Sequence, residues 1–284
     1  REPAKSLSAG QVGYVIAGIK TVSDVNIGDT ITMDSAPAAE PLAGFRQAKP
    51  VVFSSIYPVS SEDYEDLTDS LQKYKLNDAA FVYQKDSSAA LGLGFRCGFL
   101  GLLHLEIVQE RLEREYGQSI IMTVPSVEYH FVLTNGETVS VDNPLYYPDP
   151  ATIQKSLEPY IKTSILIPER YMGAVMELCL ERRGENSRFN YPTPGRIEIL
   201  FDMPLAEILY DFYDRLKTVT QGYGSFDYEI LDYRENNLVK LDILVNGEKV
   251  DALSQIVHKD RARLRALNAC ARLKEEIPRH MFKI

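Results

Sequence analysis

The chain has 284 residues, and its 31 Lys and Arg against 40 Asp and Glu give a formal net charge of −9. With 45% hydrophobic and 25% charged residues, it has the composition of a globular protein and is too apolar for a disordered one. The acidic balance excludes a protein that coats nucleic acid over its whole surface, although one basic site would still fit. No run approaches the ~18 apolar residues that a membrane span needs. The first residue is not Met, so we expect a fragment.

The spacing of the cysteines and histidines indicates neither a disulfide framework nor a metal site. Cys97, Cys179 and Cys270 are far apart and odd in number, which argues against a disulfide framework or a thiolate zinc site and favours a reducing compartment. The four histidines share no metal-ligand spacing. Cys97 and His104 could pair as nucleophile and base, which keeps a cysteine-dependent hydrolase open as an alternative. Their Gly- and Leu-rich surroundings favour a buried packing role instead.

The N-terminal 48 residues predict strands followed by a linker. Residues 11–19 are rich in β-formers, and a turn at 26–30 leads into a second predicted strand that ends near residue 32. Residues 35–50 contain many Ala and Pro without any period, which is typical of a linker.

Residues 49–126 predict a compact β-α-β-β-α-β unit. Strands are expected at 51–57, 79–84, 89–97 and 119–124. One helix is indicated by apolar residues that share a face, namely Tyr64, Leu67, Leu71 and Tyr74, and the other by Leu105, Val108 and Leu112. This order is typical of a ferredoxin-like fold.

A hairpin and a second unit of the same order follow. Asn135–Gly136 predicts a tight turn within residues 127–142, and a Pro- and Asp-rich connector extends to 157. Residues 158–235 repeat the β-α-β-β-α-β order, with a helical stripe at Leu205, Leu209, Phe212 and Leu216. The predicted fold class is therefore α+β, with two ferredoxin-like units in series.

The last part, residues 236–284, predicts the start of an α/β domain. A strand at 238–245, a turn at Asn246–Gly247 and a returning strand precede a helix from about His258 to Glu276. A further strand is expected after Pro278.

Motifs for nucleotide binding or hydrolysis are absent from the sequence. There is no phosphate-binding G-x-x-x-x-G-K-[ST] loop, no G-x-S-x-G and no H-E-x-x-H. The glycines at 92, 94, 98 and 101 precede a predicted helix, where backbone N–H groups could bind phosphate. The passage contains no Lys, so close packing of strand against helix is the favoured interpretation.

Positive charge is concentrated at the C-terminal end. Residues 258–284 contain eight basic and three acidic residues, a net charge of +5, which leaves −14 for the first 257 residues. In the predicted helix, Arg261, Arg265 and Arg272 share one face, and Leu264 and Leu267 lie on a neighbouring face. This pattern fits either a helix that docks by its apolar face and turns its arginines to a polyanion, or a plainly solvated amphipathic helix.

A second basic cluster lies in the loop after the helix that is predicted from the stripe of Tyr171, Val175 and Leu178. Arg182, Arg183 and Arg188 could bind phosphates through their guanidinium groups. Alternatively, they only complement the dipole of the preceding helix.

Several motifs in order resemble a known family. They are Gly-Phe-Arg-Cys-Gly-Phe-Leu-Gly-Leu-Leu-His-Leu-Glu at 94–106, Pro-Glu-Arg-Tyr-Met-Gly at 168–173, Arg-Arg-Gly at 182–184, Met-Pro-Leu-Ala-Glu at 203–207 and Thr-Gln-Gly-Tyr-Gly-Ser at 220–225. They resemble the third and fifth domains of elongation factor G-like translational GTPases. The sequences at 242–253 and 277–282, and the lack of a fourth domain between the units, are similar to the elongation factor 4 (LepA) family. Residues 10–20 resemble the end of that family's β-barrel domain.

The resemblance implies a ribosome-binding fragment with no catalytic site of its own and no cofactor. GTP and Mg would be bound by a GTPase domain outside this sequence, and the whole factor would move tRNAs backward on the ribosome and support fidelity under stress. The implied partners are ribosomal RNA, ribosomal proteins and tRNA, in the cytoplasm, with peripheral association at the cytoplasmic face of the membrane as an option. The implied nucleic-acid contacts are Arg182, Arg183, Arg188, His258, Lys259, Arg261, Arg265 and Arg272. A small-molecule regulatory protein remains the alternative, and it requires a deep apolar pocket between the two units.

Overall fold

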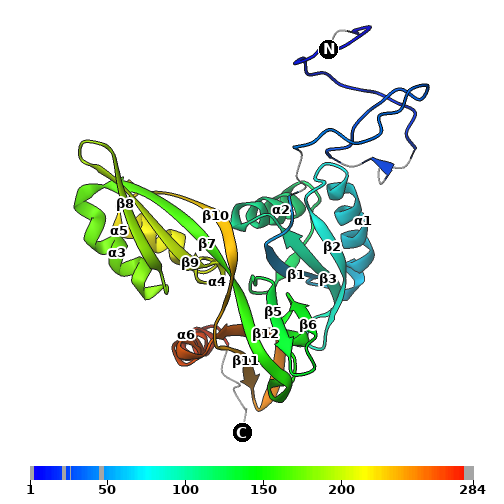
Figure 1. The fold of residues 1–284 in the computed structure, drawn as a ribbon. Coiled ribbons are helices and arrows are strands. Elements are labelled where there is room, and N and C mark those ends of the chain that lie inside the picture. The colour runs from blue at the N-terminus through cyan, green and yellow to red at the C-terminus, as the bar shows by residue number, and fades with distance from the viewer. Residues whose placement is uncertain (1–2, 21–23, 26, 45–47, 278–284) are drawn as a thin grey trace.

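The computed structural model describes residues 3–20, 24–25, 27–44 and 48–277. An N-terminal segment leads into a first sheet covered by two helices, which is followed by a long central sheet and a C-terminal hairpin with a helix (Figure 1). The architecture is α+β, as predicted.

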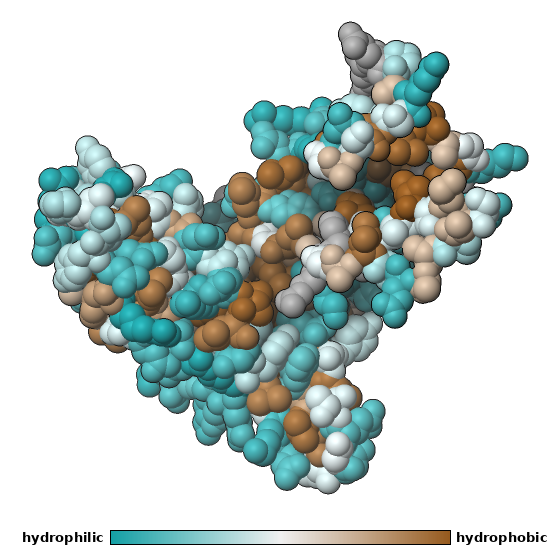
Figure 2. All heavy atoms as spheres, turned by 45° about the horizontal axis from the view of Figure 1, so that its top comes forward, coloured by the Kyte–Doolittle hydropathy of each residue, from teal (hydrophilic) through white to brown (hydrophobic). Residues whose placement is uncertain are grey.

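The N-terminal segment differs from its prediction. The described residues up to 44 contain no strand, only an isolated bridge between Met33 and Ala36. Val12 is 97% exposed and Ile16 is 94% exposed, and such apolar side chains are visible on the surface at this end of the molecule (Figure 2). A strand is stabilised by hydrogen bonds to a neighbouring strand, and the described residues offer this segment none. Neither of the two strands predicted between residues 11 and 32 is therefore formed by the residues of this range that the structure describes.

The first unit is ferredoxin-like, as predicted. Its elements are β1 (Val52–Pro58), α1 (Tyr64–Lys75), β2 (Val82–Ser88), β3 (Gly92–Phe99), α2 (Leu102–Arg114) and β4 (Ile120–Met122). The sheet order is β2-β3-β1-β4 with antiparallel neighbours. Leu67 and Leu71 of α1 and Val108 of α2 are fully buried against this sheet, because the apolar stripes of both helices face it.

The glycine-rich passage serves close packing. A Cβ atom at Gly94 would overlap Tyr57 Cδ1 and lie 2.5 Å from the backbone oxygen of Ile56. A Cβ at Gly98 would lie 2.7 Å from Val82 Cγ2. These glycines let β3 approach its neighbours closely, which agrees with the packing interpretation of the sequence.

Gly94→Ala is therefore expected to lower the free energy of unfolding by about 1–3 kcal/mol, because the added methyl group overpacks the sheet against backbone that has no room to move. Urea denaturation followed by circular dichroism measures this loss. Gly173→Ala in the helix of the second unit is the matched control, since its new Cβ would meet nothing within 4 Å. The control is expected to be neutral or up to about 1 kcal/mol more stable. Equal stability of both variants would contradict the packing argument.

The second unit has the same sheet order. Its elements are β7 (Ile153–Pro168), α3 (Met172–Glu181), β8 (Glu185–Thr193), β9 (Arg196–Pro204), α4 (Leu205–Ile208), α5 (Phe212–Val219) and β10 (Ser225–Glu235). β7 lies between β9 and β10, and β8 forms the edge beside β9. The single helix predicted from Leu205 to Leu216 is divided into α4 and α5. Between them, the Tyr210 hydroxyl donates to Gln255 Oε1 (3.0 Å), and Asp211 accepts from Arg182 (2.6 Å).

The predicted hairpin joins the second unit in one sheet. It consists of β5 (Tyr129–Leu133) and β6 (Thr138–Val141), and Gly136 in its turn has a φ of 87°. β5 pairs with the first residues of β7. β7 is a continuous strand of 16 residues, so it crosses the predicted boundary between the connector and the second unit at residues 157 and 158.

The C-terminal part consists of β11 (Leu238–Val245), β12 (Glu248–His258) and α6 (Lys259–Glu276). Asn246 and Gly247 have φ angles of 54° and 84°, so the predicted Asn-Gly turn is present. The helix prediction is also confirmed. The strand expected after Pro278 lies outside the described residues.

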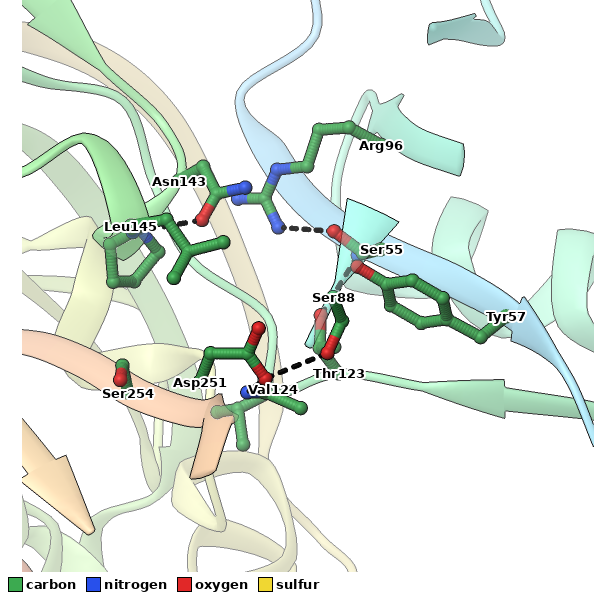
Figure 3. Close-up of a pocket in the computed structure, with 12 residues that line it drawn as sticks. Ser55, Tyr57, Ser88, Arg96, Thr123, Val124, Asn143, Leu145, Asp251 and Ser254 are labelled. Carbon is green, nitrogen blue, oxygen red and sulfur yellow. Dashed lines mark hydrogen bonds between the residues drawn. The ribbon is translucent and has the colours of Figure 1, made fainter. Parts of the chain in front are cut away.

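The C-terminal hairpin contacts both ferredoxin-like units. In the first unit, the Asp251 carboxylate accepts hydrogen bonds from Ser88 Oγ (2.7 Å) and from the backbone N–H of Ala89 (2.7 Å), and Figure 3 shows Asp251 turned toward Ser88. On the side of the second unit, Gln255 accepts the hydrogen bond from Tyr210. β12 therefore contacts both ferredoxin-like units through side-chain hydrogen bonds.

Candidate nucleic-acid interface

The end of α3 turns two of the predicted arginines inward. Arg183 adopts a left-handed conformation with a φ of 58°, and the Gly184 N–H donates to the Cys179 carbonyl (2.8 Å), which closes the helix end. Gly184 is needed at this point because a Cβ there would lie 2.7 Å from the Cys179 oxygen. This reversal of the backbone sends the Arg183 side chain toward the interior, while Arg182 reaches Asp211 (2.6 Å).

Glu207 lies at the centre of a buried ion-pair cluster, the Glu207 cluster. Its carboxylate accepts from Arg183 Nε (2.9 Å) and from Arg265 of α6 (3.3 Å). Arg183 also binds both oxygens of Glu158, at 2.6 and 2.9 Å. The Arg265 guanidinium carbon lies 3.6 Å from the centroid of the Tyr210 ring. The cluster joins the loop after α3, the strand β7 and the helices α4 and α6.

The electrostatics of the Glu207 cluster favour the ionised state. Burial raises the pKa of Glu207, but the charges of Arg183 and Arg265 outweigh that effect, so the pKa lies below its ordinary value. Burial lowers the pKa of Arg183, but its hydrogen bonds and charge contacts with Glu158 and Glu207 are stronger, so this pKa is raised. We therefore correct the predicted set of nucleic-acid contacts: the guanidinium groups of Arg182, Arg183 and Arg265 hold the chain together internally.

Arg188 lies apart from this cluster on the edge strand β8. Its side chain is 60% exposed, and its nearest carboxylate oxygen, on Asp202, is 3.7 Å away. Asp202 is held more closely by Arg234 (2.9 Å). Arg188 is therefore a solvent-facing cation with a weak internal contact.

α6 lies against the second unit by the face that carries Arg265, which is neither of the two arrangements that the sequence left open. Arg265 is on the side that faces the second unit, whereas Leu264 and Leu267 are 51% and 59% exposed. The reason is the Glu207 cluster, which recruits Arg265 and turns the leucines outward. His258 caps the helix, since its Nδ1 accepts from the N–H of Asp260 (3.3 Å).

Of the remaining predicted cations of α6, Lys259 and Arg272 are exposed and Arg261 is half-buried. In the part of the chain that the structure describes, Lys259, Arg261 and Arg272 form no ion pair. The same holds for Arg263 and Lys274 of this helix, which were not among the predicted contacts. The concentration of positive charge after residue 257 could have identified Arg263 and Lys274 as candidates.

The carboxylates Glu158 and Glu207, which bind the buried arginines, were not predicted from the sequence either. Glu158 lies just before the strand predicted from Pro159 to Ile167, and in the structure it is a buried acidic residue of β7, which requires a cation partner.

The alternative functions receive no support from the geometry. The cavity at the junction of the first unit and β12 measures about 20 Å³, has mixed walls that include Arg96, Asp251 and Leu145, and has room for about one water (Figure 3). It is not the deep apolar pocket that a metabolite site would need. Within the described ranges, no cluster of His, Cys, Asp and Glu could hold a metal ion, and no helix is long and apolar enough to cross a membrane.

Cys97 and His104 do not act on each other. His104 Nε2 lies 2.7 Å from Asp78 Oδ2, and its Nδ1 accepts from the N–H of Leu100 (2.9 Å). Cys97 is fully buried, and burial raises the pKa of its thiol. A protonated, enclosed thiol is a poor nucleophile.

Alkylation at neutral pH is therefore expected to modify Cys270, which is exposed, and to leave Cys97 and Cys179 unmodified in the folded chain. Iodoacetamide labelling followed by peptide mass spectrometry measures this, with urea-unfolded protein as the control in which all three thiols react. Rapid labelling of Cys97 in the native state would restore the hydrolase alternative.

Comparison with known proteins places the chain in a family. The model "Elongation Factor G, domain III" matches residues 47–124, "Elongation factor G C-terminus" matches 155–244, and "GTP-binding protein LepA C-terminus" matches 245–284. A solved structure from Thermus thermophilus aligns over 70% of this chain and 43% of its own, with 18% identity and a TM-score of 0.43.

Curated relatives match along the whole chain. "Elongation factor 4" of Syntrophobacter fumaroxidans is 72% identical and that of Syntrophus aciditrophicus is 70% identical, each over 100% of this chain and 48% of the relative. "Elongation factor 4" of Treponema denticola is 57% identical over 98% of this chain and 46% of its own. The chain thus spans about half the length of these relatives and belongs to the elongation factor 4 (LepA) family.

Proposed function

We propose that this chain is the ribosome-docking part of a translation elongation factor and that it contacts RNA through α6. The observation that carries the proposal is the contrast between two groups of cations. Arg182, Arg183 and Arg265 are neutralised by internal carboxylates, whereas Lys259, Arg263, Arg272 and Lys274 of α6 are exposed, Arg261 is half-buried, and none of these five forms an ion pair among the described residues. Unpaired cations along one helix suit a row of phosphates.

A net charge of −9 does not oppose this role. At physiological ionic strength, charges are screened over about 8 Å, so RNA close to α6 experiences the local charge of the helix. The Glu207 cluster fixes α6 to the second unit through Arg265. The contribution of the chain is therefore positional: two ferredoxin-like units hold a basic helix at the place where it meets RNA.

We extend the proposal to the whole factor by family membership. A GTPase domain outside this sequence would bind GTP and Mg, and the factor would move tRNAs backward on the ribosome in the cytoplasm, with ribosomal RNA, ribosomal proteins and tRNA as partners. Peripheral association with the cytoplasmic face of the membrane is a further property to test.

The proposal is tested by measuring how strongly the 284-residue chain binds purified ribosomes at several salt concentrations. A triple variant, Lys259→Gln with Arg261→Gln and Arg272→Gln, is expected to bind more weakly. It should also lower the slope of log affinity against log salt by about 0.7–0.9 for each lost phosphate contact.

The matched control is Arg114→Gln, which removes an exposed arginine of α2 that pairs with Glu110 at 2.8 Å. This variant is expected to bind like the wild type. An affinity that is independent of salt, or an α6 variant that binds as well as the control, would overturn the role of the helix.

A further inference from the structure

The C-terminal hairpin of β11 and β12 is attached firmly to the second unit and its sheet. Leu238 and Ile256 of the hairpin are buried in the hydrophobic core. The Ile256 carbonyl accepts a hydrogen bond from the hydroxyl of Tyr129 in β5 (3.1 Å). The helix that follows the hairpin adds the buried pair of Arg265 and Glu207. Apolar burial and a buried ion pair therefore make the hairpin and the second unit one body.

A single carboxylate makes the corresponding contact with the first unit. Asp251 accepts from Ser88 Oγ and from the N–H of Ala89, both at 2.7 Å, at the turn between β2 and β3. In the ranges that the structure describes, these two bonds, here named the Asp251 contact, are the hydrogen bonds between the first unit and the hairpin. Ser88 Oγ also accepts from the N–H groups of Ala90 and Leu91, each at 3.1 Å. The turn therefore keeps bonds of its own when the carboxylate leaves.

The surfaces around the Asp251 contact are not closely packed. The cavity of about 20 Å³ lies between Arg96 and Asp251, and Figure 3 shows these two side chains on different sides of it. A second cavity, of about 10 Å³, lies further along β12 beside Gln255. The start of α2 also approaches β10, since a Cβ at Gly101 would lie 2.8 Å from Tyr228 Oη. Within a chain, polar interfaces of this kind resemble those of transient complexes and permit relative motion.

The other attachment of the first unit lies where the chain leaves it. The chain passes from β4 to β5 through residues 123–128. The buried guanidinium of Arg96 holds this crossing, because it donates to Ser126 Oγ (2.6 Å) and to the Asp142 carbonyl. Ser126 and Phe53 also exchange two backbone hydrogen bonds of 2.8 Å. A covalent crossing that a buried cation holds is a natural pivot, whereas the Asp251 contact can open without unfolding either unit.

We propose that the Asp251 contact is a releasable lock that sets the angle between the first unit and the rest of the molecule. When it is formed, the first unit, the hairpin and the second unit move as one body. When it is broken, the first unit turns about residues 123–128 and the hairpin stays on the second unit. The two states differ by two hydrogen bonds to a carboxylate, a difference that a partner of the first unit can supply.

The inference goes beyond the proposed function, because it concerns how α6 is placed relative to the first unit, whatever each of them binds. The lock couples the two through one side chain of β12. Removing the Asp251 carboxylate should therefore change the arrangement of the two bodies without unfolding either of them.

The test measures the distance between the two bodies in the whole chain by pulsed electron paramagnetic resonance. One spin label is attached to Cys270 on α6, which is exposed, and the other to the cysteine of Gln72→Cys, at an exposed position of α1. The parent chain is expected to give one narrow distance. Asp251→Ala removes both hydrogen bonds, so the ratio of closed to open molecules should fall by about tenfold. A second, broader distance would report the open molecules.

Asp242→Ala is the matched control. Its carboxylate accepts from Ser254 Oγ at the same distance of 2.7 Å, but both residues lie in the hairpin, so this bond does not join the two bodies. The control is expected to keep the single distance, and thermal unfolding checks that both variants are folded. Two results would overturn the inference: a single unchanged distance in Asp251→Ala, or the same second distance in Asp242→Ala, which would indicate a general loosening of the hairpin. Neither result affects the proposed function, which is tested by the α6 triple variant on ribosomes.

Discussion

Replacing Glu207 by Gln is expected to lower the free energy of unfolding by about 3 kcal/mol. Glu207 is 4% exposed, and its carboxylate is the anion that neutralises Arg265 and shares Arg183 with Glu158. Glutamine keeps nearly the same shape but removes the charge, so a partly buried guanidinium loses its counter-ion while the packing is preserved. Urea denaturation at neutral pH, followed by circular dichroism, measures the difference.

Glu115→Gln is the control for this experiment. Glu115 is 53% exposed and pairs with Arg111 one helical turn away, so its loss should cost no more than about 0.5 kcal/mol. A double variant, Glu207→Gln with Arg265→Met, should recover part of the lost stability, because it removes the unpaired charge as well. If Glu207→Gln were as stable as the control, the buried cluster would not be what fixes α6 to the second unit.

The same substitution connects stability with function. Arg265 attaches α6 through Glu207 and stacks on Tyr210, and the leucines on the other side of the helix make no comparable contact. A loosened α6 would present its cations in many orientations. We therefore expect Glu207→Gln to bind ribosomes more weakly, although Arg261 and Arg272 are intact, because the proposed role of the helix depends on its position.

The local elements were readable from the sequence because their signals are local. The stripe of Leu67 and Leu71 and the Asn246–Gly247 turn depend on neighbours a few residues away, and both are present in the structure. The two β-α-β-β-α-β orders follow from such elements, and they led to the correct fold class. The strands expected at residues 11–32 failed for the opposite reason: a strand depends on a partner strand, which the described residues do not provide.

The contacts of the basic residues were not predictable in the same way. Arg183 meets carboxylates 24 and 25 positions away in the sequence, and Arg265 meets Glu207 at a separation of 58. Charge patterns identify where cations are concentrated but not which of them find an internal partner. The sequence left open whether α6 docks by the apolar face of Leu264 and Leu267 or is solvated, and in the structure Arg265 contacts the buried carboxylate of Glu207 while both leucines are exposed.

Acid is expected to destabilise the fold over a defined pH range. Burial raises the pKa of Asp202, but hydrogen bonds from Arg234 and Asn186 and the charge of Arg234 outweigh it, so that the pKa lies below 3.8, and the pKa of Glu207 likewise lies below 4.5. A carboxyl whose pKa is lower in the folded state stabilises the fold above its unfolded pKa, and this stabilisation is lost as the pH falls through the folded pKa. The loss should therefore begin below about pH 4.5.

Measuring the free energy of unfolding at about pH 7, 5 and 3 should show little change between the first two values and a marked loss at the third. Each carboxyl that is protonated only in the unfolded state contributes up to about 1.4 kcal/mol per pH unit. Asp142 acts in the opposite direction, because burial raises its pKa above 3.8 despite the charge of Arg96. Glu207→Gln should start from a lower stability and lose less of it on acidification. If the free energy of unfolding of Glu207→Gln and of the wild type fell by the same amount on acidification, the charge of Glu207 would not be what holds the cluster together.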